Sequence, residues 1–218
     1  MLSSRCTGKG APKERFLNYF KELDKALASF DTLRLDAVGF ACTASSYLVD
    51  PEDERRKVVA LEAEYGYPVI TAASAIHQAL QDMGAASVAI ACPYPSWLFD
   101  RAVSFWKGCG YHIAASVSLQ PRMTDTRAIY DVSGAAAGRK LIEEFDGVEA
   151  DVFVITGTGM PGLQAIVDLQ RASGQTVVNS NLCLAWACLK VAGIPFNERA
   201  GSKKFPLLGG WKDEIRRL

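Results

Sequence analysis

A cysteine followed by hydroxyl side chains stands at the end of a short apolar run in the first quarter of the chain. The run begins at Asp36 and leads into Cys42-Thr43-Ala44-Ser45-Ser46. A thiolate is a nucleophile and a thiol can donate a proton, while hydroxyl and backbone N–H groups nearby can hold an anion. We expect these donors to favour the thiolate and so to lower the Cys42 pKa below the free-cysteine value of about 8.5. Cys42 is the candidate catalytic residue.

The same layout returns in the second half of the chain without the thiol. Asp151 opens a second apolar run that ends in Thr156-Gly157-Thr158-Gly159, and Gly157 lies 115 residues after Cys42. Such runs are typical of buried parallel strands, and open α/β sheets place their ligands in loops at the carboxyl ends of these strands. The repeat therefore predicts two ligand loops that face one cleft, one with a thiol and one with glycine.

Strand-like and helix-like segments alternate along the chain. The predicted helices have apolar residues at helical spacing, or open with a proline and acidic residues as at Pro51-Glu52-Asp53-Glu54. The predicted helices span 13–30, 51–64, 72–83, 97–107, 131–146, 162–172 and 182–192, and the predicted strands span 35–41, 69–70, 87–92, 111–119, 151–155 and 176–178. The alternation predicts an α/β fold with parallel sheets flanked by helices.

The repeat divides these segments into two pseudo-symmetric lobes. We place an N-terminal lobe at 1–84, a C-terminal lobe at 85–192, and a segment that packs back on the lobes at 193–218. The partner of the 111–119 strand would fall at the start of the chain, and the partner of the 87–92 strand before residue 1. The first lobe is therefore expected to lack its opening strand and helix and to have one strand fewer. A shortened lobe leaves a sheet edge or an apolar face uncovered, so we expect a homo-oligomer.

The composition is that of a globular protein with one large domain or two small lobes. The chain has 218 residues, 49% of them hydrophobic, and its 24 basic residues balance 24 acidic ones. A net charge of zero gives no electrostatic reason to bind nucleic acid or an anionic membrane. No apolar run approaches the roughly 20 residues of a membrane span, and the start of the chain lacks the apolar part of a signal peptide. Six scattered cysteines without a CxxC pair predict reduced thiols and a cytoplasmic location.

Metal and nucleotide sites are both disfavoured by the spacing of polar residues. Neither His77 nor His112 has a second His, Asp or Glu at metal-ligand spacing. The loop at 156–160 follows a strand and precedes a helix, but it lacks the GxGxxG spacing and the lysine of a P-loop. Among the other thiols, Cys92 precedes Pro93-Tyr94 and is the next one that could approach the cleft.

Several strand-end segments together carry a family pattern. They are Gly39-Phe-Ala-Cys42-Thr43-Ala-Ser45, Pro68-Val-Ile-Thr71-Ala-Ala-Ser74, Val88-Ala-Ile-Ala-Cys-Pro93-Tyr94, Thr156-Gly157-Thr158-Gly159-Met160-Pro161 and Val177-Val178-Asn179-Ser180-Asn181, with Trp186 after them. This pattern, which covers most of 4–192, resembles the Asp/Glu racemase superfamily in its maleate cis-trans isomerase and arylmalonate decarboxylase branch. The resemblance implies two α/β lobes that hold a small carboxylate between them without a cofactor. It also implies one cysteine from each lobe, on opposite sides of the substrate.

The reacting atom that this resemblance implies is a carbon next to a carboxylate. Such a carbon is a very weak acid, so the charge that develops there must meet preorganised donors in a site with little water. Hydroxyls and backbone N–H groups of the two loops are suitable donors, and a phenol is a further candidate. The candidate substrate-binding residues are Thr43, Ser45, Tyr94, Gly157, Thr158 and Gly159.

The sequence departs from the family pattern where the second-lobe cysteine should stand, because Gly157 occupies that position. A mechanism with one thiol on each face of the substrate is therefore not expected, and three functions stay open. In the leading hypothesis, the Cys42 thiolate adds to a conjugated carbon and allows cis-trans isomerisation. Alternatively, Cys42 protonates the carbanion left after decarboxylation of a malonate-type acid. The third function is carboxylate binding without catalysis.

Overall fold

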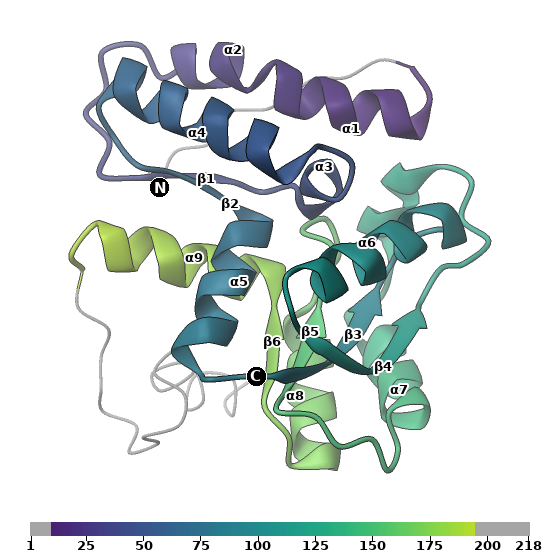
Figure 1. Cartoon of the computed structure of the whole chain (residues 1–218). Coiled ribbons are helices and arrows are strands. Elements are labelled where there is room, and N and C mark those ends of the chain that lie inside the picture. Colours follow the sequence, from purple (N-terminus) through teal and green to yellow (C-terminus); the bar gives the residue numbers. More distant parts are fainter. Residues whose placement is uncertain (1–9, 195–218) are drawn as a thin grey trace.

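The structure, a computed structural model, describes residues 10–194 and contains two parallel β-sheets flanked by helices (Figure 1). The smaller sheet pairs β1 (Val38–Phe40) with β2 (Val69–Thr71). The larger sheet has the order β4-β3-β5-β6, formed by β3 (Ser87–Cys92), β4 (His112–Ser118), β5 (Val152–Ile155) and β6 (Val177–Asn179). The strand pairs of both sheets are parallel. The predicted α/β class with parallel sheets and flanking helices is confirmed.

Helices provide the crossover connections that parallel pairing requires. They are α1 (Pro12–Lys21), α2 (Leu23–Ala28), α3 (Thr43–Ser46), α4 (Pro51–Tyr65), α5 (Ala72–Asp82), α6 (Ser96–Gly108), α7 (Gly134–Glu144), α8 (Leu163–Ser173) and α9 (Ser180–Val191), together with the 3-10 helix η1 (Thr126–Asp131). Within residues 10–194, none of the helices is both long enough and apolar enough to cross a membrane.

The internal repeat is visible in the connections of the two sheets. β1 and β5 each lead through a polar loop and a helix, α4 or α8, to a second parallel strand, which runs directly into α5 or α9. These last two helices are capped alike: Thr71 Oγ1 accepts from Ser74 N at 3.2 Å, and Asn179 Oδ1 accepts from Leu182 N at 2.8 Å. The two lobes therefore share the order of these elements and the kind of cap that begins the last helix.

Two helices link the lobes along their boundary. α9 follows the larger sheet but contacts β1 and β2 of the smaller one, and α5 packs along α9 (Figure 1). The buried side chains of α5, Ile76 and Leu80 among them, belong to the large hydrophobic core that includes β3 and β5. A smaller core contains Phe20 and Leu61 from α1 and α4. The predicted lobe boundary at residue 84 thus follows a helix that packs into the larger core.

The prediction of one continuous helix over 13–30 is wrong. The backbone leaves the helical region at Glu22 (φ −98°, ψ 18°), so the segment forms α1 and α2 instead of one helix. Two short helices, α3 and η1, were not predicted, because segments of four and six residues are too short for a helical period to show.

The one-strand difference expected between the two lobes stays a prediction. The smaller sheet has two described strands against four in the larger one. The reason is that β1 and β2 correspond to β5 and β6, and neither β3 nor β4 has a counterpart in the described part of the smaller sheet. The strand expected at the start of the chain and residues 195–218 of the predicted C-terminal segment lie outside the described residues.

Candidate active site

Cys42 stands two residues beyond the end of β1, where α3 begins. Its backbone is extended (φ −150°, ψ 91°). The strand reaches this point in close contact with α9, since a Cβ at Gly39 would lie 3.1 Å from Cys188 Sγ. The side chains of Thr43 and Ser45 are buried, whereas Cys42 is only partly buried. The thiol is therefore the more accessible polar group of this loop.

Ser45 connects the Cys42 thiol to α1. Its hydroxyl lies 3.1 Å from Cys42 Sγ and 2.8 Å from the carbonyl oxygen of Phe16, and its single proton serves one of these acceptors at a time. Burial raises the pKa of the Cys42 thiol, and the hydroxyl and N–H of Ser45 oppose that rise only in part. The expectation of a lowered pKa is therefore wrong, because the loss of water outweighs the donors. The resting thiol is protonated at neutral pH.

A buried hydroxyl pair lies beside the thiol loop. Thr43 Oγ1 and the Tyr94 hydroxyl are 2.6 Å apart, and either can be the donor. Burial raises the pKa of Tyr94 far above its ordinary value, so the phenol keeps its proton. Cys92 is fully buried, its Sγ lies 3.2 Å from Thr156 Oγ1, and burial raises its pKa to about 12. Cys92 is thus an inert core residue rather than a second thiol of the cleft.

The glycine loop at 157–159 meets the thiol loop directly. Thr158 Oγ1 donates to the carbonyl oxygen of Ala41 at 2.7 Å, and Asn181 Nδ2 donates to the carbonyl oxygen of Thr158 at 3.0 Å. The Thr158 hydroxyl therefore joins the two loops. Within residues 10–194, the backbone N–H groups of 157, 158 and 159 have no acceptor. Three successive free N–H groups are a suitable binding place for an anion.

Gly157 and Gly159 have no room for a side chain. Gly157 has φ +91°, and a Cβ there would lie 2.6 Å from Pro93 Cγ and 3.0 Å from Ile129 Cδ1. A Cβ at Gly159 would lie 2.8 Å from Ile129 Cγ2 and 3.0 Å from Tyr130 Cε1. This loop consequently offers a ligand its backbone and, apart from Thr158, no side chain.

The segments that pack on the two loops are joined to each other by Arg15. α1 contacts the thiol loop through Phe16, and η1 packs on the glycine loop through Ile129. Arg15 is buried in α1, and its Nη2 donates to Thr126 Oγ1 of η1 and lies 3.4 Å from Asp125 Oδ1. We call these three residues, Arg15, Asp125 and Thr126, the Arg15 clasp. No sequence pattern indicates this clasp, because its two halves lie more than 100 residues apart in the chain.

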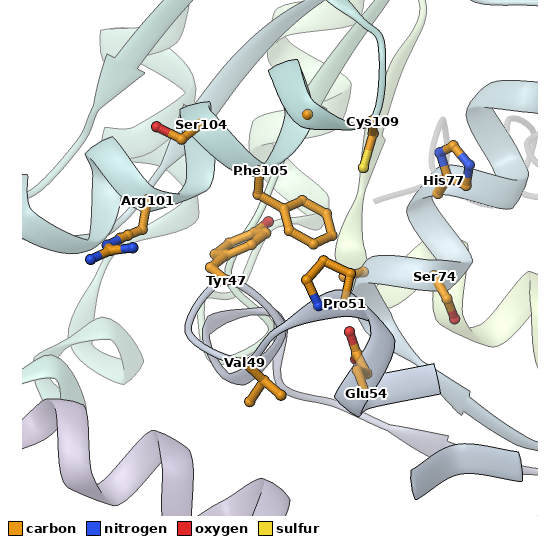
Figure 2. Close-up of a pocket in the computed structure, with 12 residues that line it drawn as sticks. Tyr47, Val49, Pro51, Glu54, Ser74, His77, Arg101, Ser104, Phe105 and Cys109 are labelled. Carbon is orange, nitrogen blue, oxygen red and sulfur yellow. The ribbon is translucent and has the colours of Figure 1, made fainter. Parts of the chain in front are cut away.

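A separate pocket of about 520 Å³ lies where α4, α5 and α6 meet (Figure 2). The aromatic rings of Tyr47 and Phe105 stand at its centre, 5.1 Å apart, and the side chains of Glu54, His77 and Cys109 border it. None of the predicted site residues lines this pocket. It touches the thiol loop only indirectly, through Tyr47 at the end of α3.

Comparisons with known proteins identify the family and the fold of the chain. The profile of the arylmalonate decarboxylase family matches residues 15–205. A maleate isomerase from Geobacillus stearothermophilus is 25% identical over 197 residues, which are 86% of this chain and 76% of that protein. The crystal structure of the maleate isomerase Iso from Pseudomonas putida S16 has a TM-score of 0.80 at 22% identity, covering 90% of this chain and 80% of that one.

A second solved structure has a similar fold. A Cys-to-Ser mutant of the Nocardia farcinica maleate cis-trans isomerase, with a covalently bound succinylcysteine intermediate, has a TM-score of 0.78 at 18% identity and covers 89% of this chain and 81% of that one. All of these relatives are enzymes. Because the profile match extends from α1 through the end of α9, the chain belongs to the arylmalonate decarboxylase family.

Proposed function

We propose that this protein isomerises a small unsaturated carboxylate of the maleate type about its double bond, with Cys42 as nucleophile and without a cofactor. The observation that carries this proposal is the asymmetry of the site. One loop presents a partly accessible thiol, and the adjoining loop presents free backbone N–H groups with no space for a second thiol. Such a site supplies one nucleophile and an anion cradle.

Addition, rotation and elimination need only these groups. Cys42 first gives its proton to solvent water. The thiolate then forms a C–S bond with one alkene carbon, and the π electrons move onto the other carbon and its carboxylate as an enediolate. The former double bond is now single and rotates. The electrons then return, the C–S bond breaks, and the trans alkene leaves with the thiolate restored. No proton enters or leaves the substrate, so the missing second thiol is not required.

The relatives support this assignment from two directions. The relative from Geobacillus stearothermophilus, which this chain matches over 76% of its length, is a maleate isomerase. The Nocardia farcinica protein carries a succinylcysteine although one of its cysteines has been replaced by serine. The C–S bond of such an adduct is the bond that the Cys42 thiolate would form with the substrate.

One observation favours decarboxylation as a second candidate function. Burial raises the pKa of Cys42, so the resting enzyme holds a thiol and not a thiolate. When an arylmalonate loses carbon dioxide, the electrons of the broken C–C bond form an enediolate, and the thiol can give its proton to that carbon and regain one from water. The same N–H groups would stabilise the enediolate.

Proton NMR in D₂O with maleate and with an arylmalonate tests both candidates. We expect fumarate without deuterium from the native protein and none from Cys42→Ser. Cys109→Ser, which removes a partly buried thiol of the separate pocket, is the matched control and should keep full activity. Loss of carbon dioxide from the arylmalonate, with maleate unchanged, would replace the first candidate by the second. Binding of either acid without turnover would leave carboxylate binding alone.

A further inference from the structure

Arg15 is the only charged residue among residues 10–194 that is buried, with 5% of its surface exposed. A guanidinium keeps its charge in proteins and has five N–H donors. In the described part of the chain, Nη2 is the only one of its nitrogens with hydrogen-bond partners, and these partners are Thr126 and Asp125. Nε and Nη1 have no acceptor there. Because no buried polar side-chain atom of the described residues lacks a partner, these two nitrogens are in contact with solvent and open to another acceptor.

Arg15 and its partner Thr126 each lie near a residue that contacts the candidate site. The next residue, Phe16, accepts a hydrogen bond from Ser45, whose hydroxyl also contacts the Cys42 thiol. On the other side, Thr126 lies one turn of η1 before Ile129, which packs against Gly157. Arg15 is therefore held between the element that contacts the thiol loop and the element that contacts the glycine loop.

The clasp carries surplus positive charge. Asp125 is paired with Arg127 as well as with Arg15, through Arg127 Nη2 at 2.6 Å and Nε at 3.0 Å. The hydrogen bonds from Arg127 hold the pKa of Asp125 well below its usual range, so this carboxylate stays ionised and largely satisfied by Arg127. Arg15 and Arg127 share the one carboxylate of Asp125, which leaves one positive charge uncompensated among these three residues.

We propose that Arg15 binds the second carboxylate of a dicarboxylate substrate through Nε and Nη1, and that it thereby makes the site select dicarboxylates over monocarboxylates. The inference rests on the proposed function, in which the reacting carboxylate lies against the backbone of 157–159. A planar guanidinium suits a carboxylate because two parallel N–H···O bonds can form. A neutral amide in the same place would accept weaker bonds and would bring no charge.

Calorimetric measurement of the binding of maleate and of its monoamide, maleamate, tests this inference. The two ligands differ by one negative charge. The measurements use Cys42→Ser protein, in which no turnover interferes. A hydrogen-bonded charge contributes about 1.5–3 kcal/mol, so Arg15→Gln should weaken maleate binding about 10- to 100-fold. Maleamate binding should weaken less than about threefold. Arg15→Lys keeps the charge but lacks the planar pair of N–H donors. Its affinity for maleate should therefore lie between those of the native residue and Arg15→Gln.

Arg55→Gln is the matched control, because it removes an exposed guanidinium of α4 that has no part in the clasp. It should leave both affinities unchanged. Equal losses for maleate and maleamate in Arg15→Gln, or no loss for either, would overturn the inference and leave Arg15 a structural link. If Arg15→Gln does not fold, an unchanged maleate-to-maleamate ratio in Arg15→Lys would overturn it instead. If Cys42→Ser protein with Arg15 intact binds neither ligand, the carboxylate site itself is wrong and the role of Arg15 falls with it.

Discussion

At the scale of single residues, the ionisation of Cys42 separates the two candidate reactions. Burial raises its pKa, so the thiolate forms only above the ordinary range of cysteine. Isomerisation needs the thiolate, and its kcat/KM should therefore rise continuously from about pH 6 to about pH 10. Decarboxylation needs the thiol, and its kcat/KM should be level at low pH and fall as pH rises through the same pKa. A pH profile of kcat/KM checks this, and an isomerase rate that falls above neutral pH would contradict it.

Gly157 is the second residue whose role can be tested alone. Gly157→Ala should cost about 1–3 kcal/mol of stability and most of the activity, because φ is +91° and the new Cβ would press on Pro93. Gly174→Ala is the control for backbone strain, since Gly174 has φ +68° and nothing within 4 Å of its Cβ position. Urea unfolding of both variants gives the comparison. Equal losses would mean that contact with Pro93 and Ile129 contributes nothing.

At the scale of secondary-structure elements, the cap of α9 should matter more than an exposed cap. Asn179 is buried and accepts from Leu182 N, so Asn179→Ala should cost about 1–2 kcal/mol. Asp50 caps α4 at the surface through Glu52 N, and Asp50→Ala should cost about 0.5–1 kcal/mol. Urea unfolding measures both, and a larger loss for Asp50→Ala would contradict the buried-cap argument.

The elements also show how far the sequence could be interpreted. The prediction of a strand at 87–92 has the observed bounds, because the run of five buried residues after Ser87 is a local pattern typical of a buried strand. α3 was missed, because four residues of Thr-Ala-Ser-Ser carry no period. Arg15 lies among polar residues of α1, and this pattern is typical of a solvent-facing side chain. Only its contact with Thr126, 111 residues away, shows that it is buried, and no local pattern encodes such a contact.

At the scale of the whole molecule, the smaller sheet supports the prediction of a homo-oligomer. Within residues 10–194, β1 pairs only with β2, whereas its counterpart β5 has strands on both sides. An edge that no strand of the described residues pairs with favours pairing with, or cover by, another chain. Light scattering coupled to size-exclusion chromatography should give a mass of at least two chains, and a stable monomer across a wide concentration range would contradict the prediction.

The stability of the whole fold should decrease at alkaline pH, because burial raises the pKa of Cys92 and of Cys183 to about 12 each. In the unfolded chain these thiols ionise near about 8.5. Their stabilisation is therefore complete below that pH and is lost as pH rises towards 12, at up to about 1.4 kcal/mol per pH unit for each thiol. Urea unfolding at several pH values should show this slope. Cys183→Ala lowers stability at every pH but should make the slope shallower, whereas an unchanged slope would mean that other groups cause the alkaline loss.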